Sequence, residues 1–254
     1  MTSRYGTSLQ PLYCTTPNLT VQGRDFRVGA HMKPDLVLGI DEAGRGPGLG
    51  PMVVAAVALD PAATQLLARA GVKDSKAFGS GPAARRARAE LATLVRCHAP
   101  FSAVETCEVP EIDAYVARGA LNELERERAR RLIRQAPACG RIIADGRALF
   151  APLAAEFPGL SACDRAEAVH LAVAAASLCA KDLRDRLFAA IALRYKDEFG
   201  DLAGGGYMNS ATRAFVAEYV RRHGCLPPEA RRSWPWPGIV APASPGEAGA
   251  LPGA

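Results

Sequence analysis

The sequence predicts an α/β domain with a mixed sheet flanked by helices. Two apolar segments, at 36–40 and 52–59, are joined by a short loop rich in glycine and proline, a pattern typical of an antiparallel pair of strands. Further apolar segments of strand length are interleaved with stretches of helical periodicity later in the chain. Strands that come first, followed by helices interleaved with later strands, indicate an α/β fold with a mixed sheet.

In the first half of the domain, residues 82–97 predict a helix and residues 101–109 a third strand. Pro110 suits the first turn of a further helix, where a backbone N–H would have no partner in any case. The buried side of that helix is expected to consist of Ile112, Tyr115, Leu121, Leu124 and Leu132. Its other side, 123–134, carries dense mixed charge, and we expect a solvated surface with ion pairs rather than a binding site.

In the second half, short strands are expected at 141–144 and 160–163. A long, mostly apolar helix is expected from Glu167 to about Lys196, and three consecutive glycines stop the pattern after it. Ser210 is a good N-cap for a last helix, which a glycine ends. The fold therefore closes with a helical segment.

The length of 254 residues suits one large domain or two small ones. Residues 1–34 show no periodicity and predict a loosely ordered leader. Residues 239–254 are rich in proline, glycine and alanine and predict a flexible tail. We therefore expect one folded domain at 35–238.

Composition and charge exclude several classes of protein. Hydrophobic residues make up 49% and charged residues 22% of the chain, which argues against a disordered or coiled-coil protein. The longest apolar run, 53–59, is far below the roughly 18 residues that span a bilayer, and the first thirty residues contain no apolar signal segment. We expect no membrane association and a cytoplasmic location. The net charge of +5 suits an anionic partner without identifying one.

The seven cysteines are odd in number and no pair has CxxC spacing. Structural zinc and a disulfide framework are therefore disfavoured, and free, mostly buried thiols are expected.

The most informative motif is the segment at 39–47, GIDEAGRGP. Asp41 and Glu42 follow an apolar strand, and neighbouring strand residues point to opposite faces, so both can meet one ligand only where the strand ends and bends. Paired carboxylates at a strand end suit Mg²⁺ or Mn²⁺. An acidic, solvated turn is the alternative, and the dipeptide alone favours it.

The loop after these carboxylates does not match a nucleotide-binding fingerprint. It contains no GxxxxGK[ST], Pro47 disagrees with GxGxxG, and the next element is a strand instead of the helix that both motifs require. A loop with bare backbone and one arginine can let a sugar-phosphate approach closely.

Further carboxylates lie at element ends. Asp145 ends the strand in IIADG, and Asp164 and Glu167 precede the long helix. Several carboxylates at element ends are the way in which a two-metal site is assembled. The polar loop KDSK at 73–76 is suited to touch phosphates, although an exposed turn explains it equally well.

Seven segments, taken together and in order, closely resemble type 2 ribonucleases H, that is, bacterial ribonuclease HII. The resemblance covers roughly 36–238 and rests on GIDEAGRGPGLGPMVVAAVAL (39–59), KDSK (73–76), VPEIDAYVARGAL (109–121), IIADG (142–146), AVAAASLCAKDLRD (172–185), GGGYMNSAT (204–212) and RRSWPWP (231–237). It implies a ribonuclease H-like fold and hydrolysis of the RNA strand of RNA–DNA hybrids. It also implies incision 5′ of single ribonucleotides embedded in duplex DNA, leaving 3′-OH and 5′-phosphate ends, by a two-metal mechanism with Mn²⁺ or Mg²⁺.

The resemblance also implies roles for individual residues. Three carboxylates would bind metal: Asp41, Glu42 and Asp145. One loop would read the ribose 2′-OH, the group that distinguishes RNA from DNA: Gly44, Arg45 and Gly46. A second loop would hold phosphates: Lys73, Ser75 and Lys76. Tyr207 would pack on the sugar of the nucleotide after the ribonucleotide.

The fourth carboxylate departs from the family, which has an aspartate there. Counting back without gaps from Ala175-Ala176-Ser177 reaches Glu167, whereas Asp164 lies three residues too early and needs a local insertion. We expect Glu167 to be the fourth catalytic and metal-binding carboxylate and, because it is longer than aspartate, to favour Mn²⁺ over Mg²⁺.

Two alternatives remain open beside a catalytic monomer that binds RNA–DNA hybrids and duplex DNA with an embedded ribonucleotide. One is a non-catalytic or weakly active hybrid-binding member of the same fold with an altered fourth carboxylate. The other is a nucleotide-dependent transferase that uses the glycine loop, which the missing fingerprint disfavours.

Overall fold

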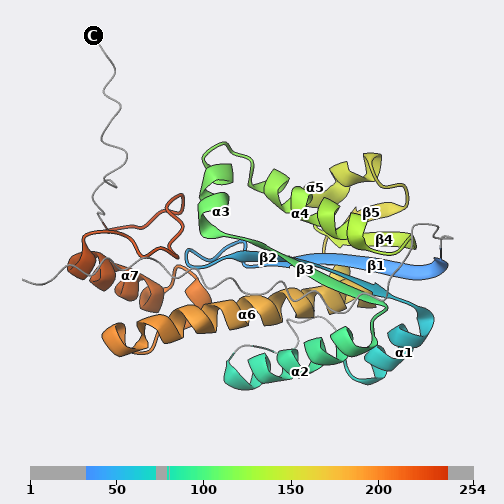
Figure 1. The fold of residues 1–254 in the computed structure, drawn as a ribbon, viewed down its shortest axis with the longest axis horizontal. Coiled ribbons are helices and arrows are strands. Elements are labelled where there is room, and N and C mark those ends of the chain that lie inside the picture. Colours follow the sequence, from blue (N-terminus) through green and yellow to red (C-terminus); the bar gives the residue numbers. More distant parts are fainter. Residues whose placement is uncertain (1–32, 73–78, 80, 240–254) are drawn as a thin grey trace, which may run out of the picture.

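The computed structural model describes residues 33–72, 79 and 81–239. Within them, a five-stranded mixed sheet has the order β3–β2–β1–β4–β5 (Figure 1). Its strands are β1 (Lys33–Ala43), β2 (Met52–Leu59), β3 (Phe101–Cys107), β4 (Cys139–Asp145) and β5 (Leu160–Cys163). The first three are antiparallel neighbours, whereas β4 is parallel to both β1 and β5. The predicted mixed sheet and its opening hairpin are confirmed.

Helices cover both faces of the sheet (Figure 1). One face carries α1 (Pro61–Arg69), α2 (Pro82–His98) and α6 (Leu171–Phe199), and the other carries α3 (Val109–Val116), α4 (Leu121–Gln135) and α5 (Arg147–Phe150). Helix α7 (Ser210–His223) extends beyond the end of the sheet. Short 3-10 turns are η2 (Ala151–Ala155), η3 (Ala166–Ala168) and η4 (Gly204–Gly206).

Strand β2 explains why the core has two layers. All of its residues are buried, as expected for a strand that is covered on both faces by helices. Val53, Ala55 and Val57 pack in the cluster that contains α6, whereas Val54 and Ala56 pack in the cluster that contains α4. Its run of apolar residues, without polar alternation, is therefore the consequence of its central position.

A close approach between β1 and α6 fixes the position of the long helix. A Cβ atom on Gly39 would lie 2.1 Å from the carbonyl carbon of Ala172, in the first turn of α6. Real Cβ atoms do not approach backbone so closely, so only glycine permits this packing. The start of α6, and η3 just before it, are thereby held against the middle of β1.

Three local predictions are wrong. The helix expected to run from Pro110 past Leu132 is broken into α3 and α4 between residues 117 and 120, where Gly119 has φ +67°. Its charged side is not fully solvated, because Glu125 and Arg128 are buried. The N-cap of α7 is Asn209, whose side chain accepts from Thr212 N at 3.0 Å, and Ser210 is the first helical residue.

Helix α1 was not predicted from the sequence, although Asp60 caps its start by accepting from Ala63 N at 2.8 Å and Pro61 follows. The expected leader and tail fall mostly outside the described residues, except that Lys33 and Pro34 belong to β1 and Ile239 packs against the α6–α7 cluster.

The six cysteines in the described part of the chain are free, but two are exposed, so the expectation of mostly buried thiols holds only in part. None of the helices described there has the length and apolar character needed to span a bilayer.

Gly39→Ala is expected to lower the free energy of unfolding by about 3 kcal/mol, the upper end of the usual cost of overpacking, because the new methyl group meets backbone. Urea denaturation measures this loss. Gly71→Ala is the control: Gly71 has φ +90° but nothing within 4 Å of its Cβ position, so only about 1 kcal/mol of backbone strain is expected. Equal losses in the two variants would disprove the packing argument.

Candidate active site

Two adjacent parallel strands, β1 and β4, bring two of the predicted carboxylates together near their C-terminal ends. Ile40 of β1 is paired with Ala144 of β4. The next residue in each strand, Asp41 and Asp145, therefore lies beside the other. Asp145 is the last residue of β4. Topology therefore explains how residues about a hundred positions apart come together.

Asp41 and Glu42 do not lie at a strand end, as the sequence suggested. Strand β1 continues to Ala43, which pairs with Val53, and the two side chains point to opposite faces. Asp41 faces α6, where the Ser177 hydroxyl hydrogen-bonds to it and Lys181 lies nearby. Glu42 faces the α4 layer and Glu125. The two carboxylates therefore lie on opposite faces of the central strand, Asp41 on the α6 side and Glu42 on the α4 side.

Glu167, not Asp164, joins this group. Glu167 is buried in η3, and its side chain is hydrogen-bonded to that of Asp145, which also accepts from Ala166 N at 2.9 Å. Asp164 is exposed and accepts from Arg147 N at 2.8 Å, at the first residue of α5. Arg165 turns the chain between them with φ +60°. The structure therefore brings Glu167, the residue reached by the gapless register from the α6 motif, next to Asp145.

Burial and mutual repulsion make the group electrostatically unfavourable by itself. Burial, followed by the charge of Glu42, raises the pKa of Asp41 to about 7. Burial raises the pKa of Glu42 to about 7, with the charges of Glu125 and Asp145 adding to it. The pKa of Asp145 is raised by burial and by its hydrogen bond to Glu167. Buried like charges of this kind need a compensating cation.

The donors fit a hard divalent cation. Asp41, Glu42, Asp145 and Glu167 offer only carboxylate oxygens, the ligands of Mg²⁺ and Mn²⁺, and no cysteine or histidine is among them. Within the described ranges, no three such side chains form a preassembled metal cage. Mg²⁺ needs no such cage, because it keeps several waters and uses one or two carboxylates.

The glycine loop after β1 is held by a residue that sequence reasoning missed. Arg231 is fully buried, and its guanidinium donates to three loop carbonyls. The bonds run to Gly50 O at 3.0 Å, Arg45 O at 2.9 Å and Gly44 O at 2.6 Å. Trp234 adds a bond from Nε1 to Gly46 O at 3.2 Å. Arg231 and Trp234 both belong to the motif RRSWPWP, which was noted in the sequence only as part of the family resemblance.

Tyr207 lies beside the same loop. Gly206 O accepts from Gly48 N at 2.9 Å and from Leu49 N at 3.1 Å, so the glycine run packs against the loop. The prediction that this run stops the long helix is wrong, because α6 ends at Phe199 with Gly200 as its C-cap. A Cβ atom on Gly46 would lie 3.6 Å from Cε1 of Tyr207. The tyrosine is 57% exposed. The structure therefore brings together the two elements predicted to contact ribose.

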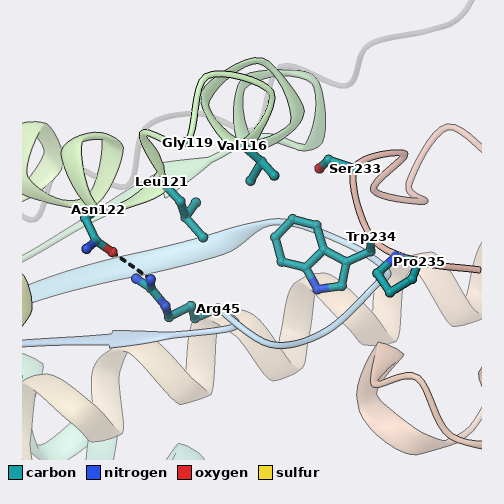
Figure 2. A pocket seen from close by; sticks show the side chains of 8 residues that line it. All are labelled: Arg45, Val116, Gly119, Leu121, Asn122, Ser233, Trp234 and Pro235. Carbon is teal, nitrogen blue, oxygen red and sulfur yellow. Dashed lines mark hydrogen bonds between the residues drawn. The ribbon is translucent and has the colours of Figure 1, made fainter.

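The Arg45 side chain points to α4. Its Nη2 donates to Asn122 Oδ1 at 2.7 Å, and its Nη1 is paired with the Glu125 carboxylate. Figure 2 shows Arg45 and Asn122 at one end of a pocket of about 380 Å³ with Trp234 on its opposite wall. Asn122 and Glu125 were not predicted as site residues. Lys73, Ser75 and Lys76 lie outside the described residues.

Comparison with known proteins identifies the family. A family model described as Ribonuclease HII matches residues 38–235. The chain belongs to the ribonuclease HII family. A ribonuclease HII from Caldivirga maquilingensis is 34% identical over 207 residues, covering 78% of this chain and 91% of that protein. The ribonuclease HII of Thermococcus onnurineus is 34% identical over 206 residues, covering 77% and 86%.

Solved structures agree with this assignment. The ribonuclease H2 of Pyrococcus horikoshii OT3 has a TM-score of 0.66 at 30% identity, covering 78% of this chain and 93% of that chain. The ribonuclease HII of Archaeoglobus fulgidus, solved in complex with PCNA, gives 0.65 at 30%, covering 79% and 95%. A Bst-RNase HIII solved with Mn²⁺ shares the fold at 24% identity, with a TM-score of 0.59, covering 75% and 63%.

As a ribonuclease HII, the chain is a divalent-metal-dependent endoribonuclease with a ribonuclease H-like fold, and it acts on RNA–DNA hybrids. The family resemblance seen in the sequence is confirmed, and so is the mixed sheet flanked by helices.

Glu167→Gln is expected to weaken Mn²⁺ binding by roughly tenfold or more, because it removes a buried charge next to Asp145. Asp164→Asn is the matched control and should bind Mn²⁺ as the unmodified protein does, since it retains an oxygen that can accept from Arg147 N. Isothermal titration calorimetry measures both affinities. Loss of binding in Asp164→Asn alone would show that the fourth carboxylate is misassigned.

Proposed function

We propose that this ribonuclease HII incises 5′ of single ribonucleotides embedded in duplex DNA, as well as cutting the RNA strand of hybrids, and leaves 3′-OH and 5′-phosphate ends. One observation carries the proposal: the loop Gly44–Gly46 is fixed by Arg231 next to the buried carboxylates, with Tyr207 beside Gly46. A site that recognises one ribose needs such a rigid sensor close to the reacting phosphate.

The loop recognises ribose mainly through its backbone. A 2′-OH both donates and accepts hydrogen bonds, so backbone N–H and C=O groups can distinguish it from a deoxyribose. Gly44 has φ +90°, and a Cβ atom there would lie 2.8 Å from Nε of Arg184. Glycine therefore gives the loop a conformation, and a close approach to Arg184, that other residues do not permit.

Tyr207 recognises the junction between ribonucleotide and DNA. Its exposed ring offers a packing surface for the sugar of the following nucleotide. A deoxyribose lacks the 2′-OH and leaves more apolar surface for such packing. This arrangement favours a ribonucleotide followed by DNA over a continuous RNA strand.

Asp41, Glu42, Asp145 and Glu167 are the proposed metal ligands and catalytic carboxylates. These four side chains would hold divalent ions, which would supply an activated water and stabilisation of the leaving 3′ oxygen. Lys181 and Ser177 offset part of the effect of burial on Asp41, since both lower its pKa. The longer side chain of Glu167 favours Mn²⁺, which is more tolerant of ligand placement than Mg²⁺.

The remaining proposals concern substrate and assembly. Duplex nucleic acid is the partner, with phosphates held by Lys73, Ser75 and Lys76. The enzyme acts as a monomer through a single catalytic domain at 35–238.

Cleavage of an RNA–DNA hybrid is expected to stop in EDTA and to return with Mg²⁺ or Mn²⁺. Asp145→Asn should lower kcat on the order of a hundredfold to a thousandfold, the usual loss when one electrostatic contact with the transition state is removed. Asp201→Asn, an exposed aspartate paired with Lys196 at 3.4 Å, is the control and should retain full activity. Unchanged cleavage in EDTA would refute the metal-dependent site.

Tyr207→Ala is expected to reduce incision at a single ribonucleotide more than cleavage of a continuous hybrid, because a packing contact of about 1–3 kcal/mol is lost at the junction. Tyr207→Phe keeps the ring and should retain most of the incision. The comparison uses kcat/KM on two duplexes of the same sequence. Equal losses on both substrates would argue against a role at the junction.

A further inference from the structure

The most unusual charge outside the proposed metal ligands is Glu125 of α4. Its side chain has no solvent exposure. One carboxylate oxygen is paired with Arg45, and the other, Oε2, has no hydrogen-bond partner in the described part of the protein. Buried carboxylates normally use both oxygens, so this one requires an explanation.

A contribution to fold stability does not explain the ion pair between Glu125 and Arg45. Burial raises the pKa of Glu125 to about 7 although Arg45 lowers it, so desolvation outweighs the attraction. Buried ion pairs of this kind are seldom more stable than apolar residues of the same size. Apart from Glu125 and Arg128, the buried side of α4 is apolar and packs in two core clusters through residues that include Leu124, Ala129 and Leu132.

The partner of Glu125, Arg45, lies between two glycines of the loop. These glycines restrict its backbone less than any other neighbours would. Arg231 fixes its carbonyl, and α4 fixes its guanidinium through Asn122 and Glu125 (Figure 2 shows the Asn122 bond). The guanidinium is held although the Arg45 side chain, which lines the pocket, is 41% exposed to solvent.

We propose that Glu125 and Asn122 are positioning residues for ribose recognition: they hold the Arg45 side chain and thereby fix the backbone of the loop that reads the 2′-OH. Neither residue touches the substrate in this role. The inference rests on the proposed reading of ribose by Gly44, Arg45 and Gly46.

The test is a double-mutant cycle on a duplex with one ribonucleotide. Glu125→Gln keeps the shape of the side chain and removes its charge, and it should lower kcat/KM about tenfold while the melting temperature stays equal or rises. In an Arg45→Met background, Glu125→Gln should have no further effect, because the group through which it acts is gone. Asn122→Ala should cause a smaller loss that also disappears in that background.

Glu123→Gln is the matched control. It makes the same change on the same helix, but Glu123 forms ion pairs with Arg126 at 3.1 Å and Arg130 at 2.7 Å, away from the loop. Its kcat/KM should equal that of the unmodified enzyme.

Three results would overturn the inference: activity of Glu125→Gln equal to that of the control, a fall in melting temperature that accompanies the loss of activity, or losses that add to those of Arg45→Met. If the unmodified enzyme cuts hybrids but not single ribonucleotides, the proposed function fails instead. The same cycle is then measured on the hybrid, whose RNA strand presents the same 2′-OH to the loop.

Discussion

The contact between Gly39 and the first turn of α6 is the constraint on which the site depends. It allows a helix to lie directly on the backbone of the central strand, with no side chain between them. Because η3 immediately precedes this helix, Glu167 is carried to Asp145. Because Ser177 and Lys181 follow on the same helix, they reach Asp41. A bulkier residue at position 39 would displace all of these groups together.

The loop that faces the substrate depends on residues from the far end of the chain. Arg231 holds the carbonyls of Gly44 and Arg45, and Gly206 accepts hydrogen bonds from Gly48 and Leu49. These contacts join segments that are more than a hundred residues apart, so the loop acquires its shape only when the C-terminal segment has packed. Local sequence does not specify its conformation, since glycines restrict the backbone so little.

Sequence reasoning succeeded for the strongest local patterns and failed where a partner came from elsewhere or where a local signal was concealed by its neighbours. The apolar runs of β1 and β2 and the acidic pair at 41–42 could be recognised directly, and the gapless register pointed to Glu167, which lies next to Asp145. Glu125 was mistaken for part of a solvated surface, because its helix is dense in mixed charge and its partner, Arg45, lies 80 residues earlier. Gly119 offered a local signal for the break between α3 and α4, but the apolar spacing on both sides concealed it.

The charges around Glu42 explain why an arginine is suited to position 45. Glu125 and Asp145 both raise the pKa of Glu42, whereas Arg45 lowers it. Without a cation beside Glu125, the α4 side of the site would hold two buried, mutually repelling carboxylates and would favour protonation of both. Arg45 opposes this effect, because its charge lowers the pKa of both Glu125 and Glu42. The same side chain therefore anchors the loop and offsets the charge of Glu125 beside the proposed metal ligands, and its planar fork presents one nitrogen to Glu125 and another to Asn122.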